Sequence, residues 1–91
     1  MSGGRIYRVR GTVQGVGFRW WTRQTAVDLG LTGTVRNDVD GSVVCVAWGG
    51  DEALDKLEAR LAHGPAGAQV EGVDREADPD PPAPAAFTIS R

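Results

Sequence analysis

The sequence is poor in cysteine, histidine and long apolar runs. Its one cysteine, Cys45, excludes an intrachain disulfide and a cysteine-based metal knuckle. Its one histidine, His63, has no partner for metal binding or nucleophilic catalysis, so we expect a solvent-facing cation at a helix C-terminus. The longest apolar run, residues 43–48, is too short to span a membrane. Residues 1–5 lack the apolar region of a secretory signal, and we expect a cytoplasmic protein.

Length and charge narrow the possible classes of protein further. With 91 residues, 41% of them hydrophobic and 24% charged, residues 1–91 are expected to form a single globular domain. The net charge is −2, which argues against a surface that coats nucleic acid. The charge is uneven, however: residues 1–37 carry six arginines and one acid, and residues 38–91 carry four basic and eleven acidic groups. The basic first third leaves room for a local anion site.

Periodicity predicts seven elements. Strands are expected at residues 6–10, 34–37, 42–48, 68–77 and 87–91, with a bulge near Gly72 in the fourth. A helix of about three turns begins at Phe18 and ends before Gly30, and a second one, which Asp51 would cap, ends at His63. Asp40-Gly41 predicts a hairpin between the second and third strands.

The order of these elements indicates the fold. It is βαββαβ with one further short strand, which is the split pattern of a ferredoxin-like α+β sandwich. We therefore expect an antiparallel sheet with two helices on one face and a short C-terminal strand. The third strand is apolar on both faces, so it is expected to be central.

Several possible functional motifs lack residues that their function requires. Asp38-x-Asp40-Gly41 suggests a calcium loop, but its first and twelfth positions would be Arg36 and Ala47. The strand at 42–48 offers only Trp48 for stacking on RNA, and Cys45 alternates into an apolar face as a core residue. A site built from two catalytic carboxylates remains an alternative, although each acidic residue has a simpler role as a cap, a turn former or a surface residue.

The glycine loop at residues 11–17 carries more information. It does not match a nucleotide fingerprint, because Trp20 stands at the third glycine position and no P-loop lysine follows. Glycines between a strand and a helix still let backbone N–H groups turn inward, next to the positive end of the helix. The loop is therefore a candidate anion cradle, or else an ordinary turn.

Two longer segments resemble the signatures of the acylphosphatase family. They are residues 11–19, GTVQGVGFR, and residues 33–43, GTVRNDVDGSV. Gly64-Pro65 and the terminal Phe87-Thr88-Ile89 are also similar to that family, so the resemblance covers about residues 5–91. The departures are minor: Thr34 stands where many members carry tryptophan, Trp20 and Trp21 replace an aromatic-plus-hydroxyl pair, and the proline-rich loop is individual to this chain.

The resemblance implies the ferredoxin-like fold and hydrolysis of the carboxyl–phosphate bond of small acyl phosphates. It implies that Arg19 binds the phosphoryl group and that Asn37 orients the attacking water. The backbone N–H groups of Gln14, Gly15, Val16, Gly17 and Phe18 would complete the phosphate cradle. It implies neither metal nor cofactor, and we expect inorganic phosphate as product and competitive inhibitor. No nucleic-acid or membrane partner is expected, and a monomer suffices.

One alternative stays open, a non-catalytic anion-binding module of the same family, such as a domain of a larger carbamoyl-transfer enzyme. The start at Met1 and the end after the last strand favour a free-standing enzyme. The presence of both Arg19 and Asn37 argues against a degenerate module.

Overall fold

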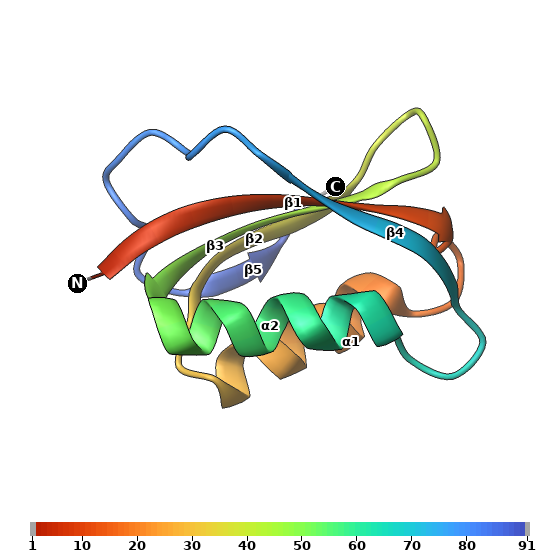
Figure 1. Ribbon diagram of the computed structural model, residues 1–91, viewed down its shortest axis with the longest axis horizontal. Coiled ribbons are helices and arrows are strands. Elements are labelled where there is room, and N and C mark those ends of the chain that lie inside the picture. The colour runs from red at the N-terminus through yellow and green to blue at the C-terminus, as the bar shows by residue number, and fades with distance from the viewer. Residues whose placement is uncertain (1, 91) are drawn as a thin grey trace.

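Seven elements follow one another in the computed structural model, which describes residues 2–90 (Figure 1). They are β1 (Ser2–Thr12), α1 (Phe18–Asp28), β2 (Thr32–Asn37), β3 (Val43–Gly50), α2 (Asp51–His63), β4 (Gln69–Glu76) and β5 (Phe87–Ile89). All seven expected elements are present, with ends that differ by a few residues. Arg91, the last residue of the final predicted strand, lies outside the described residues.

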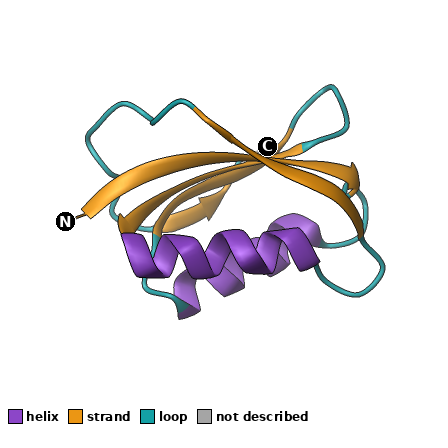
Figure 2. Ribbon diagram, viewed as in Figure 1, coloured by secondary structure: helices purple, strands orange, loops and turns teal. Residues whose placement is uncertain are grey.

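The strands form one sheet in the order β4-β1-β3-β2-β5. The first four pair antiparallel, and β3 lies at the centre, as its two apolar faces indicate. Among residues 2–90, both helices lie on one face of this sheet and none lies on the other (Figure 2). The ferredoxin-like α+β architecture is thus confirmed. The short β5 pairs in parallel with β2, which makes the sheet mixed.

Strand β1 is longer than its alternating pattern predicts. Residues 2–5 add no amphipathic signal, but they pair with β3 in unbroken register from Ser2↔Gly50 onward. Backbone pairing therefore extends the strand beyond its side-chain pattern. The predicted bulge is present: Arg10 pairs with Gly72 and Gly11 with Val70, so Glu71 is the extra residue of β4.

The core lies between the sheet and the helices. Tyr7 and Val9 of β1 are fully buried on the helix side, as are Leu54, Leu57 and Leu61 of α2. The expected face of α1 is buried as well, through Phe18, Thr22, Thr25 and Ala26. A single apolar face on each helix is what fixes both helices to the same side of the sheet.

The helix ends follow the local sequence closely, with one exception. After α1, Gly30 donates to the Val27 carbonyl at 3.0 Å and Leu31 to the Ala26 carbonyl at 2.9 Å, which is a Schellman motif. The prediction that Asp51 caps α2 is wrong. The N-cap is Gly50, in an extended conformation, and Asp51 is the first helical residue with no side-chain cap bond. Its carboxylate instead lies in the first turn, where the helix dipole favours it. Among residues 2–90, no helix is long and apolar enough to cross a membrane.

Candidate active site

The loop between β1 and α1 takes its shape from two glycines. Gly15 and Gly17 have φ angles of 79° and 75°, in the left-handed region that side chains with a Cβ rarely adopt. A Cβ at either position would meet no atom within 4 Å, so the backbone angle and not crowding favours glycine. The chain thereby turns sharply into α1, with Gly17 as its N-cap.

The start of α1 is left open to an anion. Among the hydrogen bonds within residues 2–90, none is donated by the backbone N–H groups of residues 14–18. The first turn of α1 holds no acidic residue, and no side chain caps it. Unpaired N–H groups together with the positive end of the helix favour a negatively charged ligand.

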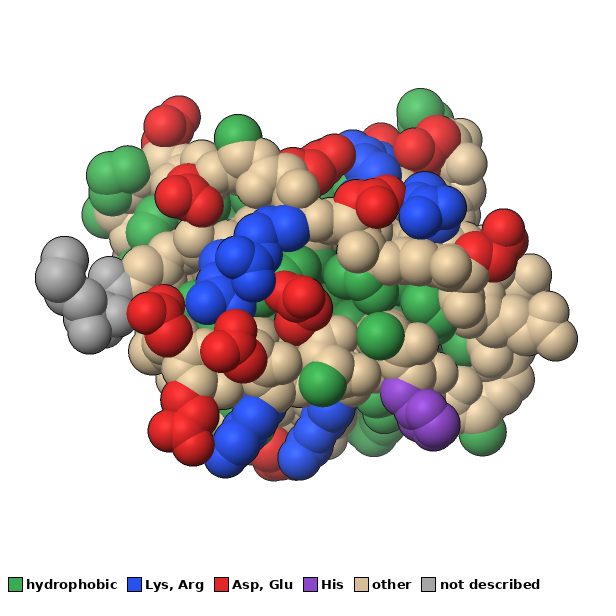
Figure 3. Space-filling view, in the orientation of Figure 1, with side chains coloured by type: hydrophobic (Ala, Val, Ile, Leu, Met, Phe, Trp, Pro, Cys, Tyr) green, Lys and Arg blue, Asp and Glu red, His purple; other side chains and the backbone are tan. Residues whose placement is uncertain are grey.

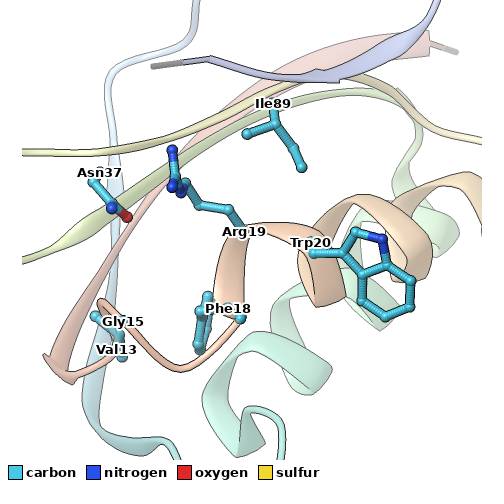
Figure 4. A pocket seen from close by; sticks show the side chains of 8 residues that line it. Val13, Gly15, Phe18, Arg19, Trp20, Asn37 and Ile89 are labelled. Carbon is cyan, nitrogen blue, oxygen red and sulfur yellow. The ribbon is translucent and has the colours of Figure 1, made fainter.

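A hollow of about 170 Å³ lies in front of this helix start (Figure 4). Its floor and walls come from the glycine loop, the first turn of α1, the end of β2 and β5. The lining residues are Val13, Gly15, Gly17, Phe18, Arg19, Trp20, Asn37 and Ile89. Three segments that are distant in the sequence thus meet at one site.

Arg19 and Asn37 both line this hollow. Arg19 lies in the first turn of α1, and Figure 4 shows its side chain extending toward Asn37, the last residue of β2. Its Nη1 donates to the carbonyl of Ser90 at 3.4 Å. Both side chains are partly exposed, so a ligand in the hollow has access to them. A cation in the first turn of a helix is electrostatically unfavourable unless an anion lies nearby.

The hollow contains five of the seven residues that the resemblance implies. Gly15, Gly17, Phe18, Arg19 and Asn37 line it, whereas Gln14 and Val16 belong to the same loop without lining it. The side chain of Val16 packs against the core. Ile89 and the Ser90 carbonyl were missed, because β5 joins the site through pairing with β2 and carries no motif.

The side chain of Gln14 has a role that the sequence did not reveal. Its Nε2 donates to the carbonyl of Asp38 at 2.7 Å and to that of Ser42 at 2.9 Å. These two carbonyls belong to the turn between β2 and β3, directly after Asn37. Gln14 therefore ties the glycine loop to the turn that carries Asn37.

Ion pairs with an arginine hold the acidic residues of the turn between β2 and β3. Arg8 lies 2.6 Å from Asp38 and 3.1 Å from Asp40 through its Nη1. The guanidinium of Arg8 lowers the pKa of the Asp38 carboxyl, and hydrogen bonds from Ser42 lower the pKa of Asp40. These interactions favour the charged form of both carboxylates, in keeping with their expected role as turn formers.

The remaining reactive side chains lie away from the hollow. Cys45 is fully buried in β3, and burial raises the pKa of its thiol to about 12. His63 is exposed in the last turn of α2, as expected. Within the described residues 2–90, no group of three or more His, Cys, Asp or Glu side chains is placed to hold a metal ion.

Comparison with known proteins decides the family. The acylphosphatase family model matches residues 5–89, which is nearly the whole chain. The chain belongs to the acylphosphatase family. An acylphosphatase of Nitratidesulfovibrio vulgaris is 51% identical over 93% of this chain and 87% of its own length. One from Rhizobium etli is 55% identical over 76% of this chain and 73% of its own.

The solved structures agree with this assignment. An acylphosphatase from Coxiella burnetii superposes with a TM-score of 0.91 at 34% sequence identity, over 98% of this chain and 93% of its own. The chain is thus an acylphosphatase enzyme, whose substrates are acyl phosphates and whose product is phosphate.

Proposed function

We propose that this acylphosphatase binds its substrate phosphate in the hollow at the start of α1. The observation that carries this proposal is the meeting of Arg19, Asn37 and the glycine loop around one cavity. The backbone N–H groups of residues 14–18 would donate to phosphate oxygens, and the Arg19 guanidinium would hold two further oxygens in a fork. The positive charge of Arg19 and of the helix start would then be neutralised together by the ligand.

The reaction needs little acid–base chemistry from the protein. The leaving group is a carboxylate with a reference pKa near 4, so it departs with its electron pair and without a general acid. Phosphoryl transfer depends mainly on positioning and on stabilisation of charge on the equatorial oxygens. Arg19 and the loop amides supply that stabilisation without a metal ion.

Asn37 is proposed to orient the nucleophile. Its side-chain carbonyl would accept a hydrogen bond from a water on the side of the phosphorus opposite the leaving carboxylate. That water forms the new P–O bond while the P–O bond to the acyl group breaks. The proton of the water passes to an oxygen of the transferred phosphate, so inorganic phosphate and a carboxylate are released.

The test is a spectrophotometric assay with benzoyl phosphate. We expect hydrolysis at full rate in EDTA, competitive inhibition by inorganic phosphate, and loss of both activity and inhibition in Arg19→Ala. The matched control is Arg23→Ala, since Arg23 lies on the same helix outside the hollow and donates to the Phe87 carbonyl. Inhibition by EDTA that magnesium reverses would contradict the mechanism. The alternative of a non-catalytic anion-binding module predicts phosphate binding without turnover.

We propose further that residues 1–91 act as one domain and as a monomer in the cytoplasm, with no nucleic-acid or membrane partner. The support is the net charge of −2 and a hollow built from a single chain. Sedimentation equilibrium of the active enzyme at micromolar concentration tests the monomer. A dimer with the same specific activity would refute it.

A further inference from the structure

The face of the sheet opposite the two helices carries a charged cluster centred on Arg8. We call this set of residues, Arg8, Asp38, Asp40, Ser42 and Glu76, the Arg8 cluster. Arg8 lies in β1 between Tyr7 and Val9, whose side chains are buried on the helix side, so its own side chain extends from the opposite face. In the view of Figure 3, which is the orientation of Figure 1, basic and acidic side chains lie next to one another at several places on the surface.

The Arg8 cluster connects three segments of the chain. The Nη1 of Arg8 donates to Asp38 Oδ2 at 2.6 Å and to Ser42 Oγ at 2.7 Å, and it lies 3.1 Å from Asp40 Oδ2. Its Nε donates to Glu76 Oε2 at 3.0 Å, at the end of β4. The side chains of Arg8 and Asp38 are only 22% and 24% exposed, so this pair is better shielded than an ordinary surface ion pair.

The cluster acts on the turn that follows Asn37. Asp38 is the next residue in the chain, and its three polar groups are all engaged. Its carboxylate accepts from Arg8 and Arg36, its carbonyl from Gln14 and Gly41, and its N–H donates to the Ser42 carbonyl at 2.9 Å. The residue that follows Asn37 is therefore held through its N–H, its carbonyl and its carboxylate. Asn37 points into the hollow on one face, and Arg8 holds its neighbour on the other.

We propose that Arg8 is a positioning residue for Asn37, a role that rests on the function proposed for Asn37 above. Arg8 does not line the hollow, so it does not touch the substrate. It holds the turn at residues 38–42 in one conformation, and this fixes the line along which Asn37 presents its carbonyl to water. Misplacement of an orienting group by about 1 Å is sufficient to lower a rate by a large factor.

The experiment removes the charged guanidinium of Arg8 and keeps an unbranched side chain. In Arg8→Met, kcat for benzoyl phosphate is expected to fall about tenfold. KM and the inhibition constant of inorganic phosphate should stay within about twofold, because the cradle is untouched. The matched control is Arg10→Met. Arg10 lies in the same strand and forms an ion pair with Asp74 at 2.6 Å, and within residues 2–90 its side chain donates no hydrogen bond to the turn. It should keep wild-type kcat, and Arg8→Lys should recover part of the loss.

A double-mutant cycle separates positioning from general damage. If Arg8 acts through Asn37, then Arg8→Met should cost no further kcat in an Asn37→Ala background. An equal loss in both backgrounds would overturn the proposal, and so would wild-type kcat in Arg8→Met. Should Arg8→Met fail to melt cooperatively, Asp38→Asn is measured in the same way, and an unchanged kcat there also overturns it.

A spectroscopic measurement keeps this test independent of activity. Asn37 is the only asparagine in the sequence, so its side-chain amide gives a unique NMR signal once the three glutamines are assigned. Arg8→Met should shift or broaden that signal, whereas Arg10→Met should leave it unchanged. An unshifted signal in Arg8→Met would refute the positioning role even if the wild-type protein hydrolysed no acyl phosphate. Lack of activity with a shifted signal would refute only the proposed function.

Discussion

Arg19 places a permanent positive charge at a helix end that is already positive. The first turn of α1 contains no acid to compensate it, and the one hydrogen bond that the structure shows for the guanidinium within residues 2–90 is the 3.4 Å contact with the Ser90 carbonyl. Such an arrangement is stable in the presence of a bound anion and is strained electrostatically without one. This agrees with the proposal that Arg19 takes part in both binding and chemistry.

Replacing Arg19 by alanine should accordingly affect both steps. We expect kcat/KM for benzoyl phosphate to fall by about 10²-fold or more, the scale on which removal of a charge-stabilising donor acts. KM and the inhibition constant of phosphate should rise as well, because Arg19 is proposed to contact the phosphate both before and during the reaction. Steady-state kinetics with a parallel thermal melt measures both effects. A near-wild-type kcat/KM would place the phosphate elsewhere.

Asn37→Ala should separate binding from turnover. Because Asn37 is proposed to contact the water and not the phosphate, kcat should fall by about 10²-fold while phosphate inhibition stays unchanged. The control is Thr34→Ala, a polar residue of the same strand that does not line the hollow. If Asn37→Ala turned over at the wild-type rate and bound phosphate normally, Asn37 would be a turn residue only.

At the scale of elements, the local sequence predicted those features of helices and turns that depend on residues close together in the chain. The apolar face of α1, its Schellman end at Gly30 and the Asp-Gly hairpin all appear as expected, since each depends on residues a few positions apart. The start of α2 was misplaced by one residue, because Asp51 is a good residue both as a cap and in the first helical turn.

What the local sequence could not show are contacts between distant elements. Arg8 is 30 residues from Asp38, and nothing in its alternating strand pattern indicates which acid it would meet. The Gln14 side chain likewise reaches carbonyls 24 and 28 residues away, although the motif had suggested only its backbone N–H. Both partners become visible only once the strand order brings the glycine loop and the turn at residues 38–42 together.

The charged turn makes stability depend on pH. Arg8 lowers the pKa of Asp38 in the folded state, so the ion pair contributes stability that is fully present above the unfolded pKa of about 4. That contribution is lost as the pH falls through the lower, folded-state value. Thermal melts between about pH 2 and 7 should therefore show the wild type losing its advantage over Arg8→Met at the acidic end. A Tm difference that stayed constant across this range would mean that Asp38 contributes no pH-dependent stability.

At the scale of the whole molecule, ligand binding should be visible as a change in stability. A ligand that binds only the folded state at one hundred times its Kd stabilises it by about 2.7 kcal/mol. Inorganic phosphate should therefore raise the Tm of the wild type in proportion to the logarithm of its concentration, and sulfate serves as the control for general salt effects. Arg19→Ala should lose most of this shift, whereas Asn37→Ala should keep it. An equal shift in Arg19→Ala would indicate that phosphate binds outside the hollow.

The architecture as a whole was predictable because several separate features of the sequence indicate the same fold. The order of the elements, the two-sided apolar pattern of β3 and the single apolar face of each helix all indicate the same sandwich. The parallel pairing of β5 was not specified, since three residues carry too little pattern to fix a partner or a direction. Yet β5 supplies Ile89 to the hollow, and Ser90, whose carbonyl accepts from Arg19, follows this strand directly.

The two edge strands of the sheet affect how readily the protein aggregates at high concentration. A free strand edge is a template on which a second chain can add by hydrogen bonding, and this is a common route to fibrils. Here one edge, β5, is only three residues long, and the other, β4, carries Glu71, Asp74, Arg75 and Glu76 together with a bulge. Short, bent or charged edges discourage such addition. Concentrated solutions of the folded protein should therefore resist the growth of amyloid, and seeding should require the chain to unfold first.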